Sequence, residues 1–347
     1  MSATVSITRN SQEWDGWCKQ AGLDDVYFTL RYGKVWEEQE AGTVVGIRLQ
    51  SELGDVLYPL LQVSLDRLDE GRGLCDLRVP YDFGGPWFST HGGPLAARLA
   101  LADEFDAVMA QLAREWNVVT EFGRMHPHAP VLYNGRQPAY AEHYWVDLSR
   151  GLEGVRGDSH PNHRKNVRGA RKRGAAVCFT SPADVEAEAR RASEDFIALY
   201  ARSMDRLGAT KSFRFSEQTL RAVLALPEIH IATARLGDAI AGMAVFLHAG
   251  QVLFYFLAAS EPAHQYCRPA NLILEEGISL AFHLGCTGLH LGGGHSGLAA
   301  FKSQIGRHRI PYYLRKQIWA PAAYEKILVA NGCTAEAVFP GYGKLIG

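Results

Sequence analysis

The sequence predicts a mixed α/β protein built from two similar units. Its 347 residues are enough for two domains of ordinary size. Each half shows the same order of patterns, namely two helices, a set of antiparallel strands, a further helix and a final strand. Hydrophobic residues make up 47% and charged residues 21% of the chain, which is typical of a globular protein and excludes a disordered chain or a coiled-coil rod.

The first half starts with a helix expected over residues 11–20 and a short strand over 26–29. A second helix is expected over residues 31–40. Two apolar segments, residues 43–50 and 56–65, are separated by SELGD, and the Gly-Asp pair in this segment is typical of a hairpin turn. These two segments therefore predict an antiparallel pair.

The first half continues with a strand expected over residues 74–79 and a long helix over 94–116. Pro94 stands at the start of that helix, where proline is favoured because the first helical N–H has no partner. The apolar segment VVTEFGR predicts the next strand. A long helix between two strands excludes a simple hairpin, so we expect these strands to be parallel neighbours.

The second half repeats the order. Helices are expected over residues 184–204 and 216–226, and three strands between 230 and 260 are joined by the tight turns LGD and HAGQ. A helix over residues 270–286 and a strand over 289–293 follow. The polar, loop-like stretch WVDLSRGLEGVRGDSHPNH predicts the boundary between the halves.

Charge and cysteine content narrow the class of protein. The 36 basic and 37 acidic side chains give a net charge of -1, which excludes a uniformly basic nucleic-acid binder but allows a local basic patch. No apolar run reaches the length of a membrane span and the N-terminus does not resemble a signal peptide, so a cytoplasmic protein is expected. Scattered cysteines predict reduced thiols rather than a disulfide or zinc framework. They are Cys18, Cys75, Cys178, Cys267, Cys286 and Cys333.

The strongest local feature is a basic segment, HPNHRKNVRGARKRG, at residues 160–174. Its six cations within ten positions are Arg164, Lys165, Arg168, Arg171, Lys172 and Arg173. At helical spacing Arg164, Arg168 and Arg171 share one face, and guanidinium groups suit phosphates. The alternative is a solvated helix whose charges have no specific partner.

A second feature is LHLGGGHSGLAAFKSQIG, at residues 289–306, in which three glycines lie between a strand and a short helical turn. Glycines at a strand end let a ligand approach the backbone closely. Lys302 stands just beyond and is suited to stabilise developing negative charge. An ordinary turn with a surface lysine is the alternative. The segment lacks GxxxxGK[ST], which excludes a Walker P-loop.

The remaining segments give no clear indication of a catalytic or metal site. The loop PYDFGGPWF, at residues 80–88, either lines a ligand groove or is a packed Ω-like loop. The pairs His126/His128 and His160/His163 lack a third ligand at metal-site spacing, so no metal is expected. No GxSxG elbow or nucleophilic cysteine signature is present.

Five of these segments together resemble the Fem-type aminoacyltransferases (FemABX). PYDFGGPWF resembles the family's PYGYGGP loop, and HRKNVRGARKRGAAV resembles its KxxRxNIRKAxKxGV segment. YARSMDRLGATKSFRF resembles TxxRxxFxxR. PANLILEEGISLAFHLGCTGLHLGGG resembles the helix and strand before the active site. FKSQIG resembles FKxxFG, with Ile305 in place of phenylalanine.

The resemblance implies an α/β fold with mixed sheets in two tandem GNAT-like domains. We place the first at residues 1–149 and the second, with the donor and catalytic site, at 150–320. The resemblance further implies that residues 321–347 pack back on the first domain. The implied reaction moves an aminoacyl group from aminoacyl-tRNA, a co-substrate, to a primary amine of a small-molecule acceptor. The acceptor is a peptidoglycan precursor or an antibiotic intermediate. No cofactor, no membrane span and no DNA partner are expected.

The resemblance also assigns roles to residues. It implies that Lys302 is the catalytic lysine and that Phe301 positions the substrate or the terminal ribose. The residues expected at the acceptor are Arg206, Arg214, Tyr255 and Tyr81. Those expected to contact tRNA are Arg164, Lys165, Arg168, Arg171 and Lys172. Near Trp36, Gln39 stands where the family has a phosphate-binding lysine, with Lys34 on the other side, which leaves room for a smaller amine.

Two other functions remain open. A CoA-dependent N-acyltransferase would bind pyrophosphate with [QR]xxGx[GA] at a helix N-terminus. At that place, residues 265–270, Arg268 replaces the glycine and Pro269 removes an N–H. Residues 171–176 fit the pattern but end a helix before a strand, which is the wrong order. The third function is non-catalytic binding on a degenerate transferase fold.

Overall fold

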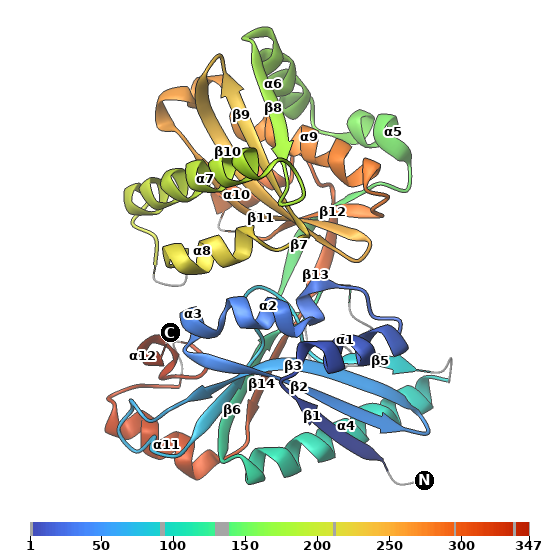
Figure 1. Cartoon of the computed structure of the whole chain (residues 1–347), viewed down its shortest axis with the longest axis vertical. Coiled ribbons are helices and arrows are strands. Elements are labelled where there is room, and N and C mark those ends of the chain that lie inside the picture. The colour runs from blue at the N-terminus through green and yellow to red at the C-terminus, as the bar shows by residue number, and fades with distance from the viewer. Residues whose placement is uncertain are drawn as a thin grey trace. The chain divides into compact units, whose positions relative to one another are not determined.

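A computed structural model of the chain describes residues 3–90, 94–128, 139–210, 213–294, 296–335 and 338–346. It divides into two compact units, Met1–Tyr140 with Tyr312–Gly347, and Ala141–Pro311. Each sheet has seven strands, with both parallel and antiparallel pairs (Figure 1). The expected mixed α/β class is confirmed.

The first sheet has the strand order β1-β2-β3-β4-β6-β14, and β5 also pairs with β3. Its strands are β1 (Thr4–Thr8), β2 (Gly42–Ser51), β3 (Gly54–Ser64), β4 (Cys75–Arg78), β5 (Trp87–Thr90), β6 (Val118–Arg124) and β14 (Leu314–Ile318). The helices of this unit are α1 (Ser11–Gln20), α2 (Leu30–Val35), α3 (Glu37–Glu40), α4 (Leu95–Glu115), α11 (Pro321–Ala330) and α12 (Gly343–Ile346).

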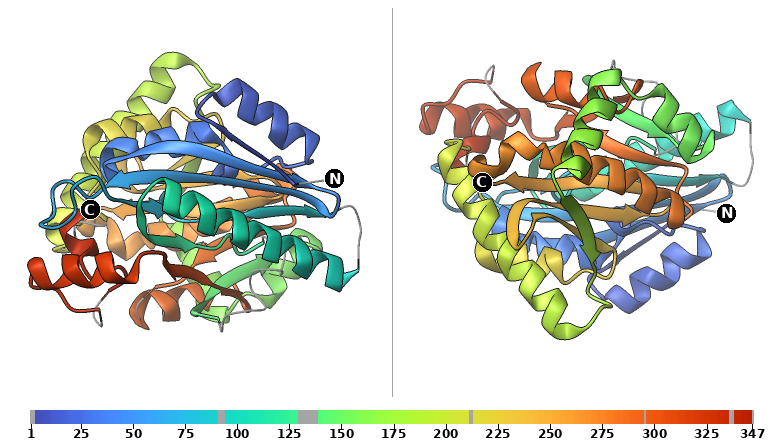
Figure 2. Two further views of the ribbon diagram at one scale, coloured as in Figure 1. Left: turned by 90° about the horizontal axis from the view of Figure 1, so that it is seen from below. Right: turned by 90° about the horizontal axis from the view of Figure 1, so that it is seen from above.

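The second sheet has the strand order β13-β7-β12-β11-β10-β9-β8. Its strands are β7 (Ala141–Asp147), β8 (Ala175–Thr180), β9 (Ile229–Leu236), β10 (Ala239–Ala249), β11 (Val252–Ser260), β12 (Gly288–Gly292) and β13 (His308–Tyr312). The helices are α5 (Gly151–Asp158), α6 (Pro161–Lys172), α7 (Glu186–Arg206), α8 (Glu217–Leu224), α9 (Pro269–His283) and α10 (Ser296–Lys302). In each unit, helices cover both faces of the sheet (Figure 2).

The repeated order of the two halves is confirmed. In the first unit β4 and β6 are parallel neighbours with α4 between them in the chain, and in the second β11 and β12 are parallel neighbours with α9 between them. The hairpin of β2 and β3 has the expected antiparallel register, which ends at the pair Ser51 and Gly54. The apolar faces that predicted these elements form the cores of the two units.

Three local expectations in the first unit are wrong. Residues 26–29 do not form a strand, because the Asp25 carboxylate accepts the Tyr27 N–H at 2.9 Å and starts the 3₁₀ turn Val26–Phe28. Residues 31–40 belong to two short helices instead of one. The Glu37 carboxylate accepts a hydrogen bond from the Val44 N–H at 2.7 Å, which holds the second helix against β2. The end of the predicted loop 80–88 belongs to β5, which pairs with β3.

The boundaries of the two units also differ from the expectation. They lie at 140/141 and 311/312 instead of 149/150 and 320/321. Asp147, at the end of β7, pairs with Gly288 of β12, so this strand belongs to the second sheet. Strand β14 pairs with β6 and returns to the first. The stretch 145–160 is not a loop either, since it holds the end of β7 and all of α5.

The C-terminal segment contributes to the core of the first unit. Tyr324, Ile327 and Leu328 of α11 pack with Leu65 and Val119. All six cysteines are free thiols. None of the helices in the described ranges combines the length and apolar character needed to cross a membrane.

Candidate functional site

Lys302 lies at the end of α10 and is buried, with 6% of its surface exposed. Its Nζ atom donates a hydrogen bond to the carbonyl oxygen of Gly293 at 2.6 Å. This contact fixes the position of the Lys302 side-chain nitrogen. The alternative of a surface lysine on an ordinary turn is therefore wrong.

The glycine turn between β12 and α10 allows this contact. Gly294 has φ of +150°, a conformation that residues with a Cβ rarely adopt. A Cβ on Gly293 would lie 2.9 Å from Cδ2 and 3.2 Å from Nε2 of His143. The turn therefore brings bare backbone against both Lys302 and His143.

Two aromatic residues lie close to this lysine in space or in sequence. The Nζ atom of Lys302 lies 6.0 Å from the centroid of the Tyr255 ring on β11, within range of a cation–π interaction. Burial raises the pKa of the Tyr255 phenol well above its ordinary value, so the hydroxyl stays protonated. Phe301 is half-buried and packs against the core of the second unit, together with the buried Ile305.

Sequence reasoning missed a histidine pair beside this turn. Nδ1 of His143 on β7 lies 3.2 Å from Nε2 of His290 on β12, and both side chains are buried. The Phe254 ring lies 4.8 Å from the His290 ring. His290 stands two residues before the first of the three glycines, which was the available signal, but its partner is 147 positions away in the chain.

Two of the expected acceptor residues lie near the end of α7. Arg206 is exposed and donates to Ser203 Oγ at 3.2 Å. Arg214 is tied to the same helix end, because it pairs with Asp205 at 2.5 Å and donates to the Ala209 carbonyl at 2.8 Å. Both arginines therefore contact groups on α7 or directly after it.

Tyr81 belongs to the other unit, in the loop PYDFGGPWF. Its ring lies 4.6 Å from the Trp36 ring, and its carbonyl accepts the Tyr32 hydroxyl at 2.7 Å. Phe83 and Phe88 of the same loop are buried. The packed-loop alternative is therefore the one that the described contacts favour.

The basic segment folds as α6, and its six cations separate into two groups. Arg164 donates to the carbonyls of Gly157 and Ser159 at the end of α5, and Arg171 pairs with Glu276 of α9 at 2.7 Å. Arg173 turns back to the Gly169 carbonyl at 2.9 Å. The other three cations are exposed and spaced so that they share one helix face. We call Lys165, Arg168 and Lys172 the cationic face.

His163, which precedes the cationic face, is part of a buried hydrogen-bond network. Its ring nitrogens lie 3.3 Å from Glu275 Oε2 and 3.0 Å from Asn271 Nδ2. Arg156 donates to the other oxygen of Glu275 at 2.7 Å. Burial opposes ionisation of Glu275, but hydrogen bonds from His163 and Arg156 hold its pKa below the ordinary value. Within the described ranges, no group of three potential metal ligands occurs.

The segment that a CoA enzyme would use to bind pyrophosphate lies between β11 and the start of α9. Arg268 adopts the left-handed conformation, with φ of +56°, and Pro269 is the first residue of the helix. Proline offers no N–H to an anion. The anion-binding end of this helix is therefore weakened where a CoA enzyme needs it.

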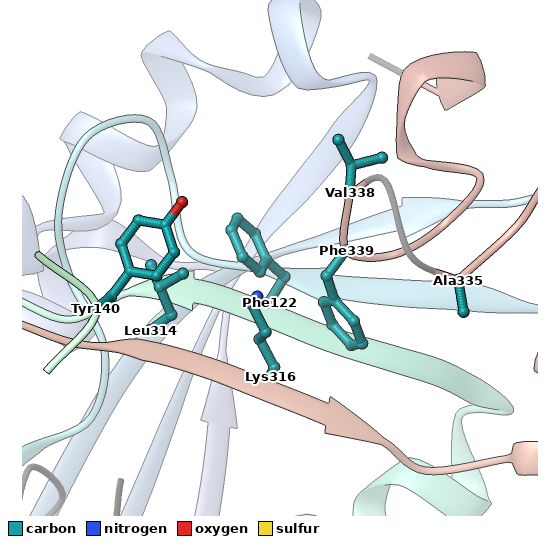
Figure 3. A pocket seen from close by; sticks show the side chains of 7 residues that line it. All are labelled: Phe122, Tyr140, Leu314, Lys316, Ala335, Val338 and Phe339. Atoms are coloured by element: carbon teal, nitrogen blue, oxygen red, sulfur yellow. The ribbon is translucent and has the colours of Figure 1, made fainter. Parts of the chain in front are cut away.

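A cavity of about 360 Å³ lies in the first unit, outside all the predicted site residues. Figure 3 shows Lys316 of β14 between Tyr140 and Phe339, with Phe122 above it. The Lys316 ammonium lies 5.8 Å from the Tyr140 ring and 5.9 Å from the Phe339 ring. A cation framed by aromatic rings suits an anionic group with a flat or apolar body.

The comparisons agree with this architecture. Residues 161–303 match the family model described as Acetyltransferase (GNAT) domain. The chain is similar in structure to FemX, with 15% identity, a TM-score of 0.67, and coverage of 94% of this chain and 100% of that one. No curated protein matches the sequence.

Two further solved structures are similar. L-PGS from Bacillus licheniformis is 11% identical, with a TM-score of 0.54 and coverage of 93% of this chain and 98% of that one. The C-terminal domain of a putative lysylphosphatidylglycerol synthetase from Agrobacterium fabrum is 12% identical, with a TM-score of 0.54 and coverage of 95% and 100%. The fold matches the two tandem GNAT-like domains that the resemblance implies, and the match to the GNAT domain model lies within the second unit.

Proposed function

We propose that this protein transfers an aminoacyl group from aminoacyl-tRNA to a primary amine of a small-molecule acceptor and forms an amide bond. The observation that carries the proposal is the buried Lys302 ammonium, held 2.6 Å from the Gly293 carbonyl at the end of a strand–glycine–helix turn. The sequence around it resembles the FK motif of the Fem-type aminoacyltransferases. The tandem GNAT fold is consistent with that family.

The chemistry is aminolysis of an activated ester. The amine attacks the carbonyl carbon, the C–N bond forms and negative charge develops on the carbonyl oxygen. An ammonium carries three donors, and the Gly293 carbonyl orients one of them. A charge that is fixed before the reaction stabilises the oxyanion without reorganisation, an effect worth about 10²–10³ in turnover for one donor.

The tRNA part of the proposal rests on the cationic face. Lys165, Arg168 and Lys172 are exposed on α6, in the same unit as Lys302. Phosphate contacts of this kind supply affinity without sequence recognition and release counterions. Arg164 and Arg171 have protein partners, so we assign the backbone contacts to the cationic face and not to them.

The competing donor is acyl-CoA. The family match over residues 161–303 favours it, because that family is described as acetyltransferase. The left-handed Arg268 and the missing N–H of Pro269 oppose it. We therefore keep CoA-dependent acylation as the second candidate.

The deciding experiment compares binding of charged tRNA and acetyl-CoA to the purified protein at two salt concentrations. We expect salt-dependent binding of tRNA and none of acetyl-CoA. Binding of acetyl-CoA without tRNA would overturn the assigned donor. If Lys302→Met left amide formation with the bound donor unchanged, the lysine would have no catalytic role.

A further inference from the structure

The first unit contains a cavity of about 360 Å³ whose lining includes none of the residues assigned to the proposed transfer reaction (Figure 3). Its volume lies in the range of small-molecule sites. The lining residues come from β6, β14, the end of the segment before β7 and the segment after α11, so the walls belong to one compact unit. Tyr140 and Lys316 are exposed, so a ligand can enter the cavity from solvent.

Contacts within the protein hold the walls of this cavity in place. Lys316 of β14 stands opposite Phe122 of β6 in the antiparallel register. The Phe339 ring lies 6.1 Å from the Phe122 ring and 6.4 Å from the Tyr324 ring of α11. On the other side, the Tyr140 N–H donates to the last carbonyl of β13 at 2.9 Å. The lining is therefore preformed, which lowers the entropic cost of binding a ligand.

Lys316 gives the cavity a positive charge that the described residues do not neutralise. Arg315, its neighbour in the chain, points to the opposite face of the sheet and contacts the carboxylates of Asp106 and Glu121. Lys316 forms no ion pair in the described part of the chain, and its ammonium lies 5.8 and 5.9 Å from the centroids of two lining rings. An ammonium has three N–H donors, and none of these meets an oxygen acceptor among the described residues. A ligand with one negative charge would therefore complete the site.

We propose that this cavity binds a small molecule with an aromatic ring body and one carboxylate. The carboxylate accepts hydrogen bonds from the Lys316 ammonium, and the ring body packs against Phe122, Tyr140 and Phe339. A single lysine matches a single negative charge, whereas a phosphate group is best matched by the planar fork of an arginine, which the lining lacks. The site does not depend on the proposed transfer reaction, so its test is separate from that of the reaction.

Matched probes of one shape test the assignment. Isothermal titration calorimetry of the full chain compares naphthoate with naphthamide, which keeps both rings but carries no charge. We expect the carboxylate to bind about tenfold more tightly than the amide, because a hydrogen bond to a charged group contributes about that factor. Lys316→Met should remove this preference. Lys326→Met, on the exposed side of α11, is the control and should retain it.

Naphthyl phosphate, the third probe, distinguishes the two classes of anion. We expect it to bind no more tightly than naphthoate, because the lining supplies one cation. Binding of the phosphate more than about tenfold tighter than that of the carboxylate would overturn the assigned ligand class.

Ring substitutions show whether the probes bind in this cavity. Tyr140→Leu and Phe339→Leu each remove one aromatic ring and keep Lys316, so naphthoate and naphthamide should both bind more weakly while the preference for the carboxylate remains. Thermal unfolding without a probe checks that each variant is folded, and the exposed Tyr140 is the position less involved in packing. Unchanged binding to both ring variants would place the probes elsewhere and overturn the proposal. The absence of naphthoate binding to the wild type, or an unchanged preference in Lys316→Met, would also overturn it.

Discussion

The Nζ atom of Lys302 lies 2.6 Å from the carbonyl oxygen of Gly293, nine positions earlier in the chain. The same glycine lies against the imidazole ring of His143. One backbone residue therefore positions a fixed ammonium on one side and touches a histidine pair on the other. The proposed activity depends on the position of the Lys302 ammonium.

Replacement of Lys302 by methionine removes the charge but keeps most of the volume. We expect turnover to fall by about 10²–10³, because the developing oxyanion loses its fixed donor. The steady-state rate of amide formation measures this loss. Lys326→Met, on the exposed side of α11, is the control and should leave the rate unchanged. A variant that folds, binds both substrates and retains full turnover would contradict the role of Lys302.

Gly293→Ala tests the close approach of the turn to His143. The added Cβ would lie 2.9 Å from the imidazole, so the ring must move, and we expect a loss of about 1–3 kcal/mol in the free energy of unfolding together with lower turnover. Chemical denaturation and the transfer assay measure the two effects. Gly157→Ala, in α5, meets no atom within 4 Å and should not destabilise the protein. Equal behaviour of the two variants would argue against a tight turn.

Charge reversal of the cationic face, by Lys165→Glu, Arg168→Glu and Lys172→Glu together, should weaken tRNA binding. The slope of log affinity against log salt should flatten by roughly 1 for each phosphate that the variant no longer binds. The control makes the same charge change at three separate exposed positions, Arg67, Arg190 and Lys326. If both triple variants bind tRNA equally weakly, net charge and not this face is responsible.

The Glu275 network predicts an acid-dependent loss of stability. Its pKa is below the ordinary value in the folded state, so the carboxylate stabilises the fold above the unfolded pKa of about 4.3. This contribution disappears as the pH falls through the lower folded value. Glu275→Gln should therefore reduce stability by about 1–3 kcal/mol at neutral pH and make unfolding less dependent on pH in the acidic range. Thermal unfolding from neutral to acidic pH measures this difference, and parallel curves for both proteins would refute it.

The first unit contains a buried ion pair that predicts a larger effect. Arg315 of β14 contacts Glu121 of β6, which also accepts hydrogen bonds from Tyr58 at 2.8 Å and from Trp319 at 3.1 Å. Arg315→Met leaves a buried carboxylate without its cation, so we expect a loss of about 3–5 kcal/mol in the free energy of unfolding. Chemical denaturation measures it.

Arg221→Met is the matched control for that change. It breaks a pair with Glu217 that is about half exposed, and such pairs contribute at most about 1 kcal/mol. A similar small loss for Arg315→Met would mean that the buried pair adds little to the stability of this sheet.

The elements that the sequence predicted correctly are those with a local signal. The β2–β3 hairpin has its turn residues, α4 and α9 have their apolar periodicity, and each lies between two strands that must then be parallel. The strand predicted over residues 26–29 is wrong because the Asp25 side chain accepts a hydrogen bond from a backbone N–H. This side-chain cap outweighs the apolar pattern. The predicted boundaries of the units are wrong because β7 and β14 pair with strands that are remote in the chain.

By itself, the sequence determined the class of fold, the repeated order of elements and the position of a lysine after a glycine-rich strand end, because these depend on patterns within a few turns of chain. Only the tertiary structure decided that Lys302 is buried against Gly293, that Arg164 closes a helix instead of facing solvent, and that His143 meets His290. The physical reason is the distance along the chain over which each interaction acts. Periodicity and turn chemistry act between neighbours, whereas a hydrogen bond across 147 positions exists only when β7 pairs with β12.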